Sequence, residues 1–297
     1  MSANRPHVTV GIPFFNEERV LAEAIRSVLA QRDVDIDVIL VNDGSSDQSL
    51  AIARSFEDPR IAVASDGERR RLPARLNEIV RRARGELVAR MDADDVMHPD
   101  RLRRQLEVFD DDPSVDVVGC SIGLVDDAGN VFAVVDSAPQ PMTAASAVET
   151  GLIAHPTMLA RRRWLLKNPY DEKLTRAEDR DLWCRTVSTS SYRSIPEPLY
   201  ALRVSTRDLR FLKDYLDAQK QNRTIYIRYG PTAVGLQRTA GLFLESYAKS
   251  LFMRVAVRAG IAGRLVRRRG RPPSAKDLQL IQQALEAGRE PVSARNV

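Results

Sequence analysis

The chain is poor in cysteine and has no long apolar stretch. Of its 297 residues, only Cys120 and Cys184 are cysteines, and they lie far apart without forming a CxxC pair. This excludes a disulfide scaffold and a cysteine-built zinc site, and it suits a reducing compartment. The first ten residues hold no signal-peptide core, and no uninterrupted apolar run approaches membrane-spanning length. We therefore expect a cytoplasmic protein.

Two common nucleotide-binding motifs are also missing. The sequence contains neither a GxGxxG nor a GxxxxGK[ST], so it lacks the dinucleotide fingerprint and the P-loop. It shows no internal repeat and no extended low-complexity tract. With 43% hydrophobic and 29% charged residues, it has the composition of an ordinary globular protein that can bury a full α/β core. A nucleotide bound here would have to be held by carboxylates, backbone groups and a metal.

The net charge of +5 conceals an asymmetry along the chain. Residues 1–200 carry 26 Lys and Arg against 33 Asp and Glu, whereas residues 201–297 carry 19 against 7. A long acidic region followed by a basic one indicates two tasks within one chain. We expect no nucleic-acid binding, because no RNA- or DNA-binding motif accompanies the basic charge.

Strand-like and helical segments alternate in the first part of the chain. Apolar runs at 8–12, 36–41, 61–64 and 87–91 predict strands, and amphipathic spacing predicts helices at 20–29, at 74–82 and from residue 99. This alternation predicts an α/β fold with a mostly parallel central sheet between helices. Segments 115–122 and 131–135 then favour a hairpin, and the pattern from residue 209 onward is almost purely helical.

Acidic or turn-forming residues follow three of these strands, at 13–17, 42–45 and 92–95. Because the carboxyl ends of parallel strands share one edge of a sheet, we expect all three segments to meet at one crevice. Asp92, Asp94 and Asp95 repel one another, and a divalent cation would offset that repulsion, since hard cations prefer oxygen ligands. We interpret the three acids as part of a metal-assisted phosphate or diphosphate site, although for Asp95 alone a turn or helix-capping role is favoured.

Four motifs occur in an order and spacing that resemble a known family. They are Pro13-x-Phe15-Asn16-Glu17, Asn42-Asp43-Gly44-Ser45-x-Asp47, Ala89-Arg90-Met91-Asp92-Ala93-Asp94-Asp95 and Ala177-Glu178-Asp179-x-Asp181-Leu182-Trp183. Over about residues 7–205 the chain resembles the family 2 glycosyltransferases, inverting enzymes of the GT-A fold that use nucleotide-sugar donors. The resemblance implies a GT-A-like nucleotide-binding fold.

The same resemblance suggests a division of the chain. Residues 1–205 would form the catalytic domain, with a nucleotide-sugar-binding half at 7–112 and an acceptor half at 113–205. Residues 206–297 would be a basic helical C-terminal region, an extension to the catalytic fold. The net charges of the two parts have opposite signs, which agrees with this division.

Five residues match the family's nucleotide-binding positions. The resemblance implies that Pro13 and Phe15 line the base and ribose and that Glu17 accepts a hydrogen bond from a ribose hydroxyl. Asp43 would accept the ring N–H of the base, usually uracil, although an Asx turn explains Asp43 equally well from the sequence alone. Arg75 would border the donor site.

The DXD and ED motifs carry the chemistry that the resemblance implies. Asp92 would lie near the ribose, and Asp94 would bind the Mn²⁺ or Mg²⁺ that bridges the diphosphate. Asp179 would be the catalytic base, taking a proton from an acceptor hydroxyl as it attacks the anomeric carbon with inversion. An acid pair placed at a helix N-terminus by the macrodipole is the alternative for Glu178 and Asp179.

Three further residues match positions near the acceptor or the diphosphate: His155, Glu178 and Trp183. Packing is the alternative for His155 and for Trp183. The chain departs from the family at Ile79, where a glycine is common, and at Ser205, where many relatives carry a histidine. A histidine metal ligand from that region is therefore not expected.

An apolar stripe with basic flanks marks the C-terminal region. Its apolar residues are Leu244, Ala248, Leu251, Val255 and Ala259, its flanks are Lys249, Arg254 and Arg258, and a basic cluster follows within 264–271. Such a segment can lie on an anionic membrane surface, which would hold the protein peripherally on the inner face of the cell membrane. The equal alternative is a helical hairpin that packs on the catalytic domain or forms a homodimer.

We therefore expect a metal-assisted transfer of a hexose or N-acetylhexosamine from a UDP-sugar to a glycan or lipid-linked acceptor. One rival is a haloacid-dehalogenase-like phosphatase using Asp92 and Asp94, but its nucleophile would sit on the first strand, whereas three strands precede Asp92. The other rival is a catalytically silent sugar-nucleotide-binding module.

Overall fold

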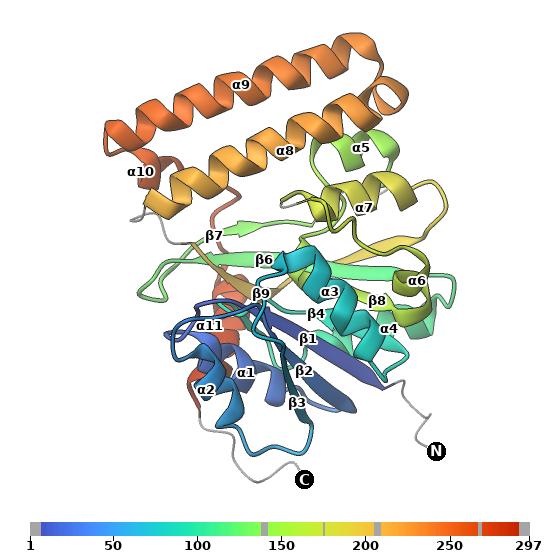
Figure 1. The fold of residues 1–297 in the computed structure, drawn as a ribbon, viewed down its shortest axis with the longest axis vertical. Coiled ribbons are helices and arrows are strands. Elements are labelled where there is room, and N and C mark those ends of the chain that lie inside the picture. The colour runs from blue at the N-terminus through green and yellow to red at the C-terminus, as the bar shows by residue number, and fades with distance from the viewer. Residues whose placement is uncertain (1–6, 138–141, 175, 205–208, 267–268, 291–297) are drawn as a thin grey trace.

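The computed structural model of the chain describes residues 7–137, 142–174, 176–204, 209–266 and 269–290 (Figure 1). Within these residues a nine-stranded sheet runs in the order β3-β2-β1-β4-β8-β6-β9-β5, and β7 pairs with β6. The strands are β1 (Val8–Phe14), β2 (Ile36–Asn42), β3 (Ile61–Ser65), β4 (Leu87–Arg90), β5 (Val96–Met97), β6 (Val117–Val125), β7 (Val131–Val135), β8 (Leu159–Arg161) and β9 (Tyr192–Arg203).

Helices connect these strands and follow them. They are α1 (Leu21–Leu29), α2 (Ser49–Arg54), α3 (Arg71–Arg82), α4 (Arg101–Asp111), α5 (Ala144–Glu149), the 3₁₀ turn η1 (His155–Thr157), α6 (Arg162–Lys167), α7 (Glu178–Thr186), α8 (Leu209–Ala233), α9 (Leu236–Arg258), α10 (Ala262–Val266) and α11 (Ala275–Arg289). No helix in the described part of the chain is both long and apolar enough to cross a membrane.

The first half of the sheet is parallel, as the alternation predicts. β1 pairs in parallel with β2 and β4, and β2 pairs in parallel with β3. Beyond β4 the sheet is mixed, because β8 is antiparallel to both β4 and β6 while β6 and β9 are parallel. The expected hairpin at 115–135 forms as β6 and β7. Parallelism is therefore confined largely to the half that ends in the acidic loops.

Side chains alternate between two cores on either side of the sheet. Val38 and Leu40 of β2 face a core that includes α1 and α4, while Ile39 and Val41 face one that includes α3, α6 and α7. All residues of β1, β2 and β4 are buried, as expected for parallel strands covered on both faces. This double cover leaves the strand ends, rather than the strand faces, available for a site.

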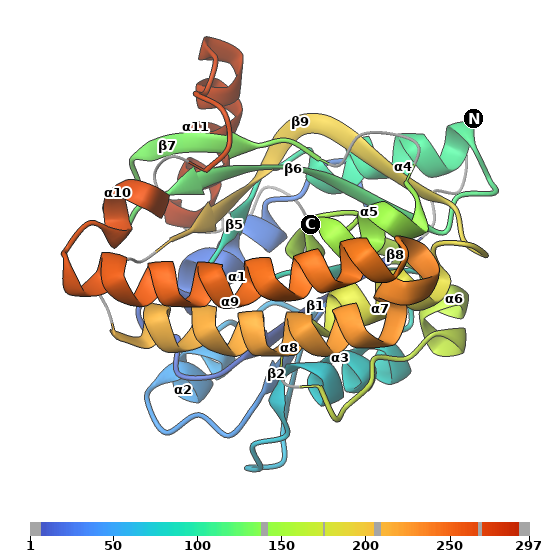
Figure 2. The ribbon, with the colours of Figure 1, turned by 90° about the horizontal axis from the view of Figure 1, so that it is seen from above.

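The C-terminal helices occupy two places. α8 and α9 form an antiparallel hairpin that lies across one end of the molecule, with α8 against α5 and α7 (Figures 1 and 2). α11 instead packs on α1, β5 and β9, at the other side of the sheet. The boundary at residue 205 stays a prediction.

Candidate donor and catalytic site

The loops after β1 and β2 are bonded to each other. The Asn16 N–H donates to Ser45 Oγ (3.1 Å), and Asn16 Oδ1 accepts the Ser46 N–H (2.8 Å). The Glu17 N–H donates to Ser49 Oγ (2.8 Å). Asn16 has φ +55, a left-handed conformation that asparagine adopts more readily than most residues. These bonds fix the backbone at Glu17, which is where a ribose contact is predicted.

Pro13 and Phe15 flank the end of β1. The Gly11 carbonyl accepts the Met91 N–H, so the backbone groups of Gly11 point toward β4. The backbone groups of Pro13, two residues on, point to the same side, where the pairing of β1 with β4 has already ended. The missing N–H of Pro13 therefore costs no ladder bond. The guanidinium of Arg69 stacks 3.5 Å from the centre of the Phe15 ring. The loop between β3 and α3 thus closes onto the predicted base-binding segment.

Asp43 is buried and already accepts several hydrogen bonds. Its Oδ1 accepts the backbone N–H groups of Arg70 (2.7 Å) and Arg71 (3.0 Å) and the Nε–H of Arg75 (3.0 Å). The turn after β2 is closed by Asn42, whose Oδ1 accepts the Ser45 N–H (3.0 Å). Asp43 therefore organises the start of α3, and its reading of a base stays a prediction.

Arg75 lies beneath this loop with only 1% of its side chain exposed. It donates to Asp66 (2.6 and 2.9 Å) and to Glu78 (2.8 Å) as well as to Asp43. Burial alone would lower the pKa of Arg75, but its bonds to Asp66, Glu78 and Asp43 outweigh burial and raise it. Arg75 ties three acids into one network, and a direct contact with a donor stays a prediction.

The three acids after β4 form a compact cluster. Oxygens of Asp92, Asp94 and Asp95 all lie within 4.8 Å of one another. Arg90 donates to both carboxylate oxygens of Asp92 (2.7 and 3.1 Å), and Asp95 Oδ1 accepts the Arg203 N–H (2.8 Å). Asp95 is buried and joins the cluster to β9, in keeping with a structural role for that residue.

The charge of this cluster suits a divalent cation. Burial, followed by the negative charge of Asp92, raises the pKa of Asp94 to about 6. Burial and the charges of Asp94 and Asp92 raise the pKa of Asp95 as well. In the described part of the chain, no side chain donates a hydrogen bond to the Asp94 carboxylate. Oxygen ligands that carry excess negative charge fit Mn²⁺ or Mg²⁺, with Asp94 as the residue that would hold it.

Arg90 joins the acid cluster to the ED motif. Its side chain is buried, and its guanidinium pairs with Asp92 while its positive charge lowers the pKa of Glu178 and of Asp94. The charges of Asp92 and Glu178 in turn raise the pKa of Arg90 against the effect of burial. The DXD and ED motifs, far apart in the sequence, therefore both experience the charge of one buried guanidinium.

The ED pair begins α7 on a strained backbone. Ala177 has φ +60, which is uncommon for a residue other than glycine, and strain of this kind clusters at functional sites. Glu178 is buried, and burial followed by the charge of Asp179 raises its pKa to about 7. Asp179 is half-buried, and its Oδ1 accepts the Arg180 N–H (2.7 Å). Both acids also lie in the first turn of α7, where the macrodipole favours them.

His155 and Trp183 lie in the interior beside Glu178. His155 Nε2 is 2.8 Å from the Tyr170 hydroxyl, and Nδ1 is 3.9 Å from Glu178 Oε1. Burial, aided by the charge of Arg90, keeps the pKa of His155 well below its ordinary value, so the ring is neutral near pH 7. Trp183 is 0% exposed and packs edge-on against His155 (6.0 Å). This burial favours the packing alternative for Trp183, and a contact of Trp183 with an acceptor stays a prediction.

Three residues that contribute to the site were given no role from the sequence: Arg90, Tyr200 and Arg203. The Tyr200 hydroxyl accepts the Asp92 N–H (3.1 Å), and Arg203 donates to the Asp94 carbonyl (3.2 Å) and pairs with Glu23. An arginine inside an otherwise apolar strand, directly before the acids, is the signal that could have identified Arg90. Ser205, where a histidine ligand is common, lies outside the described residues.

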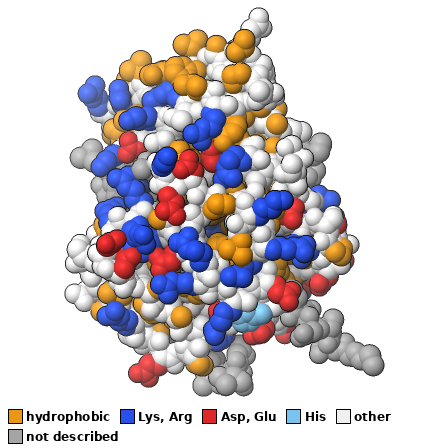
Figure 3. Space-filling model, turned by 45° about the vertical axis from the view of Figure 1, so that its right-hand side comes forward, with side chains coloured by type: hydrophobic (Ala, Val, Ile, Leu, Met, Phe, Trp, Pro, Cys, Tyr) orange, Lys and Arg blue, Asp and Glu red, His pale blue; other side chains and the backbone are white. Residues whose placement is uncertain are grey.

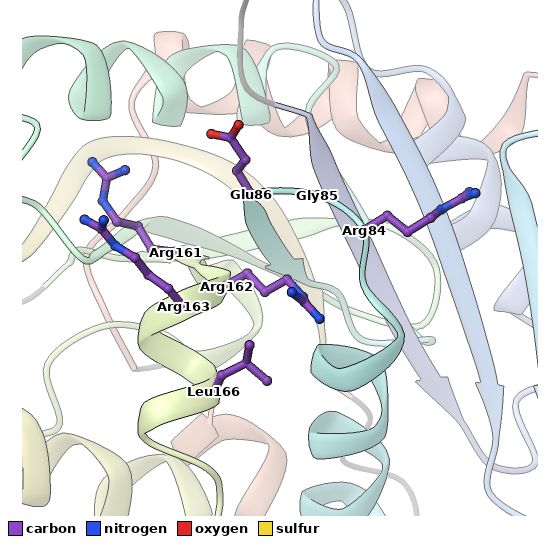
Figure 4. Close-up of a pocket in the computed structure, with 7 residues that line it drawn as sticks. All are labelled: Arg84, Gly85, Glu86, Arg161, Arg162, Arg163 and Leu166. Atoms are coloured by element: carbon purple, nitrogen blue, oxygen red, sulfur yellow. The ribbon is translucent and has the colours of Figure 1, made fainter.

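A separate basic pocket lies at the other end of β4 (Figure 4). Its lining residues are Arg84, Gly85, Glu86, Arg161, Arg162, Arg163 and Leu166. The pocket is near the amino end of β4, whereas the acid cluster follows the carboxyl end of the same strand. It is therefore distinct from the candidate site.

Comparison with known sequences assigns the family. The profile of "Glycosyl transferase family 2" matches residues 9–168, more than half of the chain. The chain belongs to glycosyltransferase family 2. Glycosyltransferase EpsE of Bacillus subtilis is 32% identical to it over 207 residues, which cover 67% of this chain and 73% of that protein.

Solved structures show the same fold. A mannosyltransferase from Pyrobaculum calidifontis, in complex with GDP-Man and Mn²⁺, matches with a TM-score of 0.61 at 17% identity and covers 97% of this chain and 87% of its own. S. aureus TarS 1-349, in complex with UDP-GlcNAc, matches with a TM-score of 0.58 at 18% identity and covers 81% and 71%.

The expected α/β, GT-A-like fold is thereby confirmed, together with the family. The sheet of this family 2 member is flanked by helices and carries a C-terminal helical part, as predicted. The family assignment also removes the phosphatase alternative for Asp92 and Asp94, which rested on a single short signature. What donor and acceptor the enzyme uses is a separate question.

Proposed function

We propose that this family 2 member transfers a hexose or N-acetylhexosamine from a UDP-sugar to a glycan or lipid-linked acceptor, with inversion at the anomeric carbon. One observation carries the proposal: the guanidinium of Arg90 pairs with Asp92 of the DXD motif, and its positive charge also acts on Glu178 of the ED motif. An inverting transfer needs the diphosphate on one side of the sugar and a base on the other. Acids of the two motifs that share the charge of one buried arginine suit such a pair of positions.

The donor side would be built from the strand-end loops. Pro13 and Phe15 line the base, Glu17 and Asp92 bind the ribose, and Asp43 accepts the base N–H. Mn²⁺ or Mg²⁺ held by Asp94 would neutralise the charge that develops on the leaving diphosphate. The hydrogen-bond network of the buried Arg75 would stabilise this side of the site. It fixes the loop between β3 and α3, in which Arg69 stacks on Phe15.

On the acceptor side Asp179 acts as the general base. Its carboxylate takes the proton of an acceptor hydroxyl, whose oxygen attacks the anomeric carbon while the bond to the diphosphate oxygen breaks on the opposite face. The pKa of Glu178, raised to about 7, leaves this neighbour about half protonated near neutrality, whereas an ordinary glutamate would be ionised. Glu178 then adds less negative charge beside Asp179 as the acceptor approaches.

The nucleotide can be tested by ligand-induced thermal stabilisation. UDP-GlcNAc and UDP-glucose, with Mn²⁺, should raise the midpoint of unfolding more than GDP-mannose does. A ligand that binds only the native state adds about 2.7 kcal/mol to the free energy of unfolding when its concentration is a hundred times its dissociation constant. A guanosine donor that stabilised more strongly would contradict the choice of UDP. The donors bound by the two solved neighbours, UDP-GlcNAc and GDP-Man, make this contrast worth measuring.

The base is tested with Asp179→Asn in a transfer assay. We expect donor binding to be retained and turnover to fall by a factor of about 10²–10⁴, the usual contribution of a general base. Glu57→Gln, an exposed acid on another surface, is the matched control and should keep full activity. Normal turnover by Asp179→Asn would refute the base assignment. UDP binding without transfer or donor hydrolysis, across a broad acceptor panel, would favour the catalytically silent module instead.

A further inference from the structure

The helix α9 is apolar on two opposite faces. Its inner face packs on α8 through buried residues, namely Leu242, Ser246, Ser250, Met253 and Ala256. Its outer face, as we define it, consists of Leu244 (68% exposed), Tyr247 (53%), Leu251 (64%), Phe252 (56%) and Val255 (54%). The stripe predicted from the sequence therefore points away from the protein, while the hairpin that carries it packs on α5 and α7 through α8.

An outer face of this kind requires an explanation. Single exposed apolar side chains are normal, but a contiguous exposed set usually marks an interaction surface. In Figure 3 hydrophobic side chains gather at the top of the molecule, over the α8–α9 hairpin, with Lys and Arg below them. Something apolar is expected to cover the outer face.

The charge around the outer face selects the partner. Arg254 and Arg258 are exposed on α9, and Glu245 is the only acid in that helix. Glu245 is neutralised by Arg238 (2.7 Å) and Lys249 (3.6 Å). Of the more distal basic residues, Arg271 is paired with Asp277 and Asp136, Arg267 and Arg268 lie outside the described residues, and the side chain of Arg264 is not described. Arg269 is exposed and lies over the ring of Tyr215 (6.0 Å), so the positive charge on α9 that flanks the apolar face comes from Arg254 and Arg258.

We propose that the outer face of α9 docks on a lipid bilayer that contains anionic headgroups. The apolar side chains would enter the headgroup boundary, and Arg254 and Arg258 would contact the negative surface. A second copy of the chain is a poorer match. A two-fold interface pairs the same patch on both subunits and would bring the basic residues of the two copies toward each other.

Docking in this way would orient the candidate site. α8 lies between α9 and α7, and it is bonded to α7 through Asp181, which accepts from Arg228 (3.0 Å) and from the Tyr229 hydroxyl (2.7 Å) (Figures 1 and 2). The helix that begins with the ED pair is thus one helical layer from the proposed lipid surface. This orientation, which rests on the proposed function, suits a lipid-linked acceptor.

The test is co-sedimentation of the full chain with vesicles. We expect binding to vesicles of one part phosphatidylglycerol to two parts phosphatidylcholine, weak binding to pure phosphatidylcholine, and a decrease as salt rises. Leu251→Glu should weaken binding at least about tenfold, since the burial of one leucine is lost. Arg254→Gln with Arg258→Gln should weaken it about fivefold per residue. The vesicles contain no nucleotide sugar, so the result does not depend on the proposed reaction.

Helix α6 provides the matched controls. Leu166→Glu changes another exposed leucine (46%), and Arg163→Gln with Lys167→Gln removes the same charge from an exposed surface. Both controls should bind anionic vesicles as the native chain does, and light scattering should find native and variant chains monomeric. Absence of binding to anionic vesicles, or unchanged binding by Leu251→Glu, would overturn the proposal. So would a dimer that Leu251→Glu dissociates, because a second copy would then cover the outer face.

Discussion

Asp43 follows β2 and Asp94 follows β4, the two strands that pair with β1, yet the two carboxylates have opposite electrostatic surroundings. Asp43 accepts from two backbone N–H groups and from a buried arginine. Asp94 is crowded by Asp92 and Asp95. The first carboxylate stabilises its loop, whereas the second is held at a cost to the fold. A site acid can therefore be part of the scaffold or part of a binding function, and its partners distinguish the two.

Glu178 belongs with Asp94 in this comparison. Both acids have a pKa raised by burial and by a neighbouring carboxylate, and both lie within the field of Arg90. Perturbed acids of this kind cluster at functional sites. We therefore expect substitutions to change the free energy of unfolding in opposite directions: downward at Asp43, and upward at Glu178 and Asp94.

The largest effect is expected for Asp43→Ala. It leaves two buried N–H groups and the Arg75 guanidinium without their shared acceptor, and the loss of one partner of a buried ion pair costs about 3 kcal/mol or more. Denaturant unfolding measures this loss. Asp111→Ala, at an exposed position on α4, should stay within about 0.5 kcal/mol of the native chain. If the two variants are equally stable, Asp43 does not organise the loop.

A smaller and opposite effect is expected for Glu178→Gln. The native state keeps a proton on Glu178 up to about pH 7, while the unfolded chain releases it near the ordinary value of 4.5. The contribution of Glu178 to the free energy of unfolding therefore falls as the pH rises from 4.5 to about 7. Above this window the variant, which lacks the buried charge, should be more stable by on the order of 2 kcal/mol. Unfolding curves measured across the window test this, and a variant that is less stable at every pH would contradict it.

The smallest effect on stability is expected for Asp94→Asn. Removal of one charge from the crowded cluster should stabilise the metal-free protein by about 1 kcal/mol, because solvent already screens part of the repulsion. The same variant should lose the additional stability that Mn²⁺ confers in the presence of UDP. Asp110→Asn, an exposed acid of α4, should keep it. An Asp94→Asn chain that still responds fully to Mn²⁺ would remove Asp94 from the proposed metal site.

Local patterns in the sequence predicted the parts of the fold that local physics decides. The runs at 8–12, 36–41 and 87–91 became β1, β2 and β4, because continuous apolar segments of that length suit strands covered on both faces. The convergence of the strand-end loops followed from parallel pairing. The bonds between those loops, such as that from Asn16 to Ser45, depend on backbone conformations that no periodicity encodes.

Long-range packing was the part that the sequence did not reveal. The sequence shows Arg90 only as one residue of a strand motif, but its charge acts both on Asp92, with which it pairs, and on Glu178, which is remote along the chain. The same limit explains Trp183, whose burial depends on the packing of His155 and Tyr192 around it. The outer face of α9 was visible as a stripe, but only the position of α8 determines which side of the helix is exposed.

The hydrogen bonds that α8 donates to Asp181 have a practical consequence for protein engineering. This carboxylate is fully buried, and besides Arg185 (2.8 Å) its donors come from α8. A shortened chain that stopped after β9 would remove two of the three donors to this carboxylate in the first turn of α7 and leave Arg185 as its partner. Anyone trimming the polypeptide for crystallisation or for domain transplantation should therefore retain the helix that begins at Leu209.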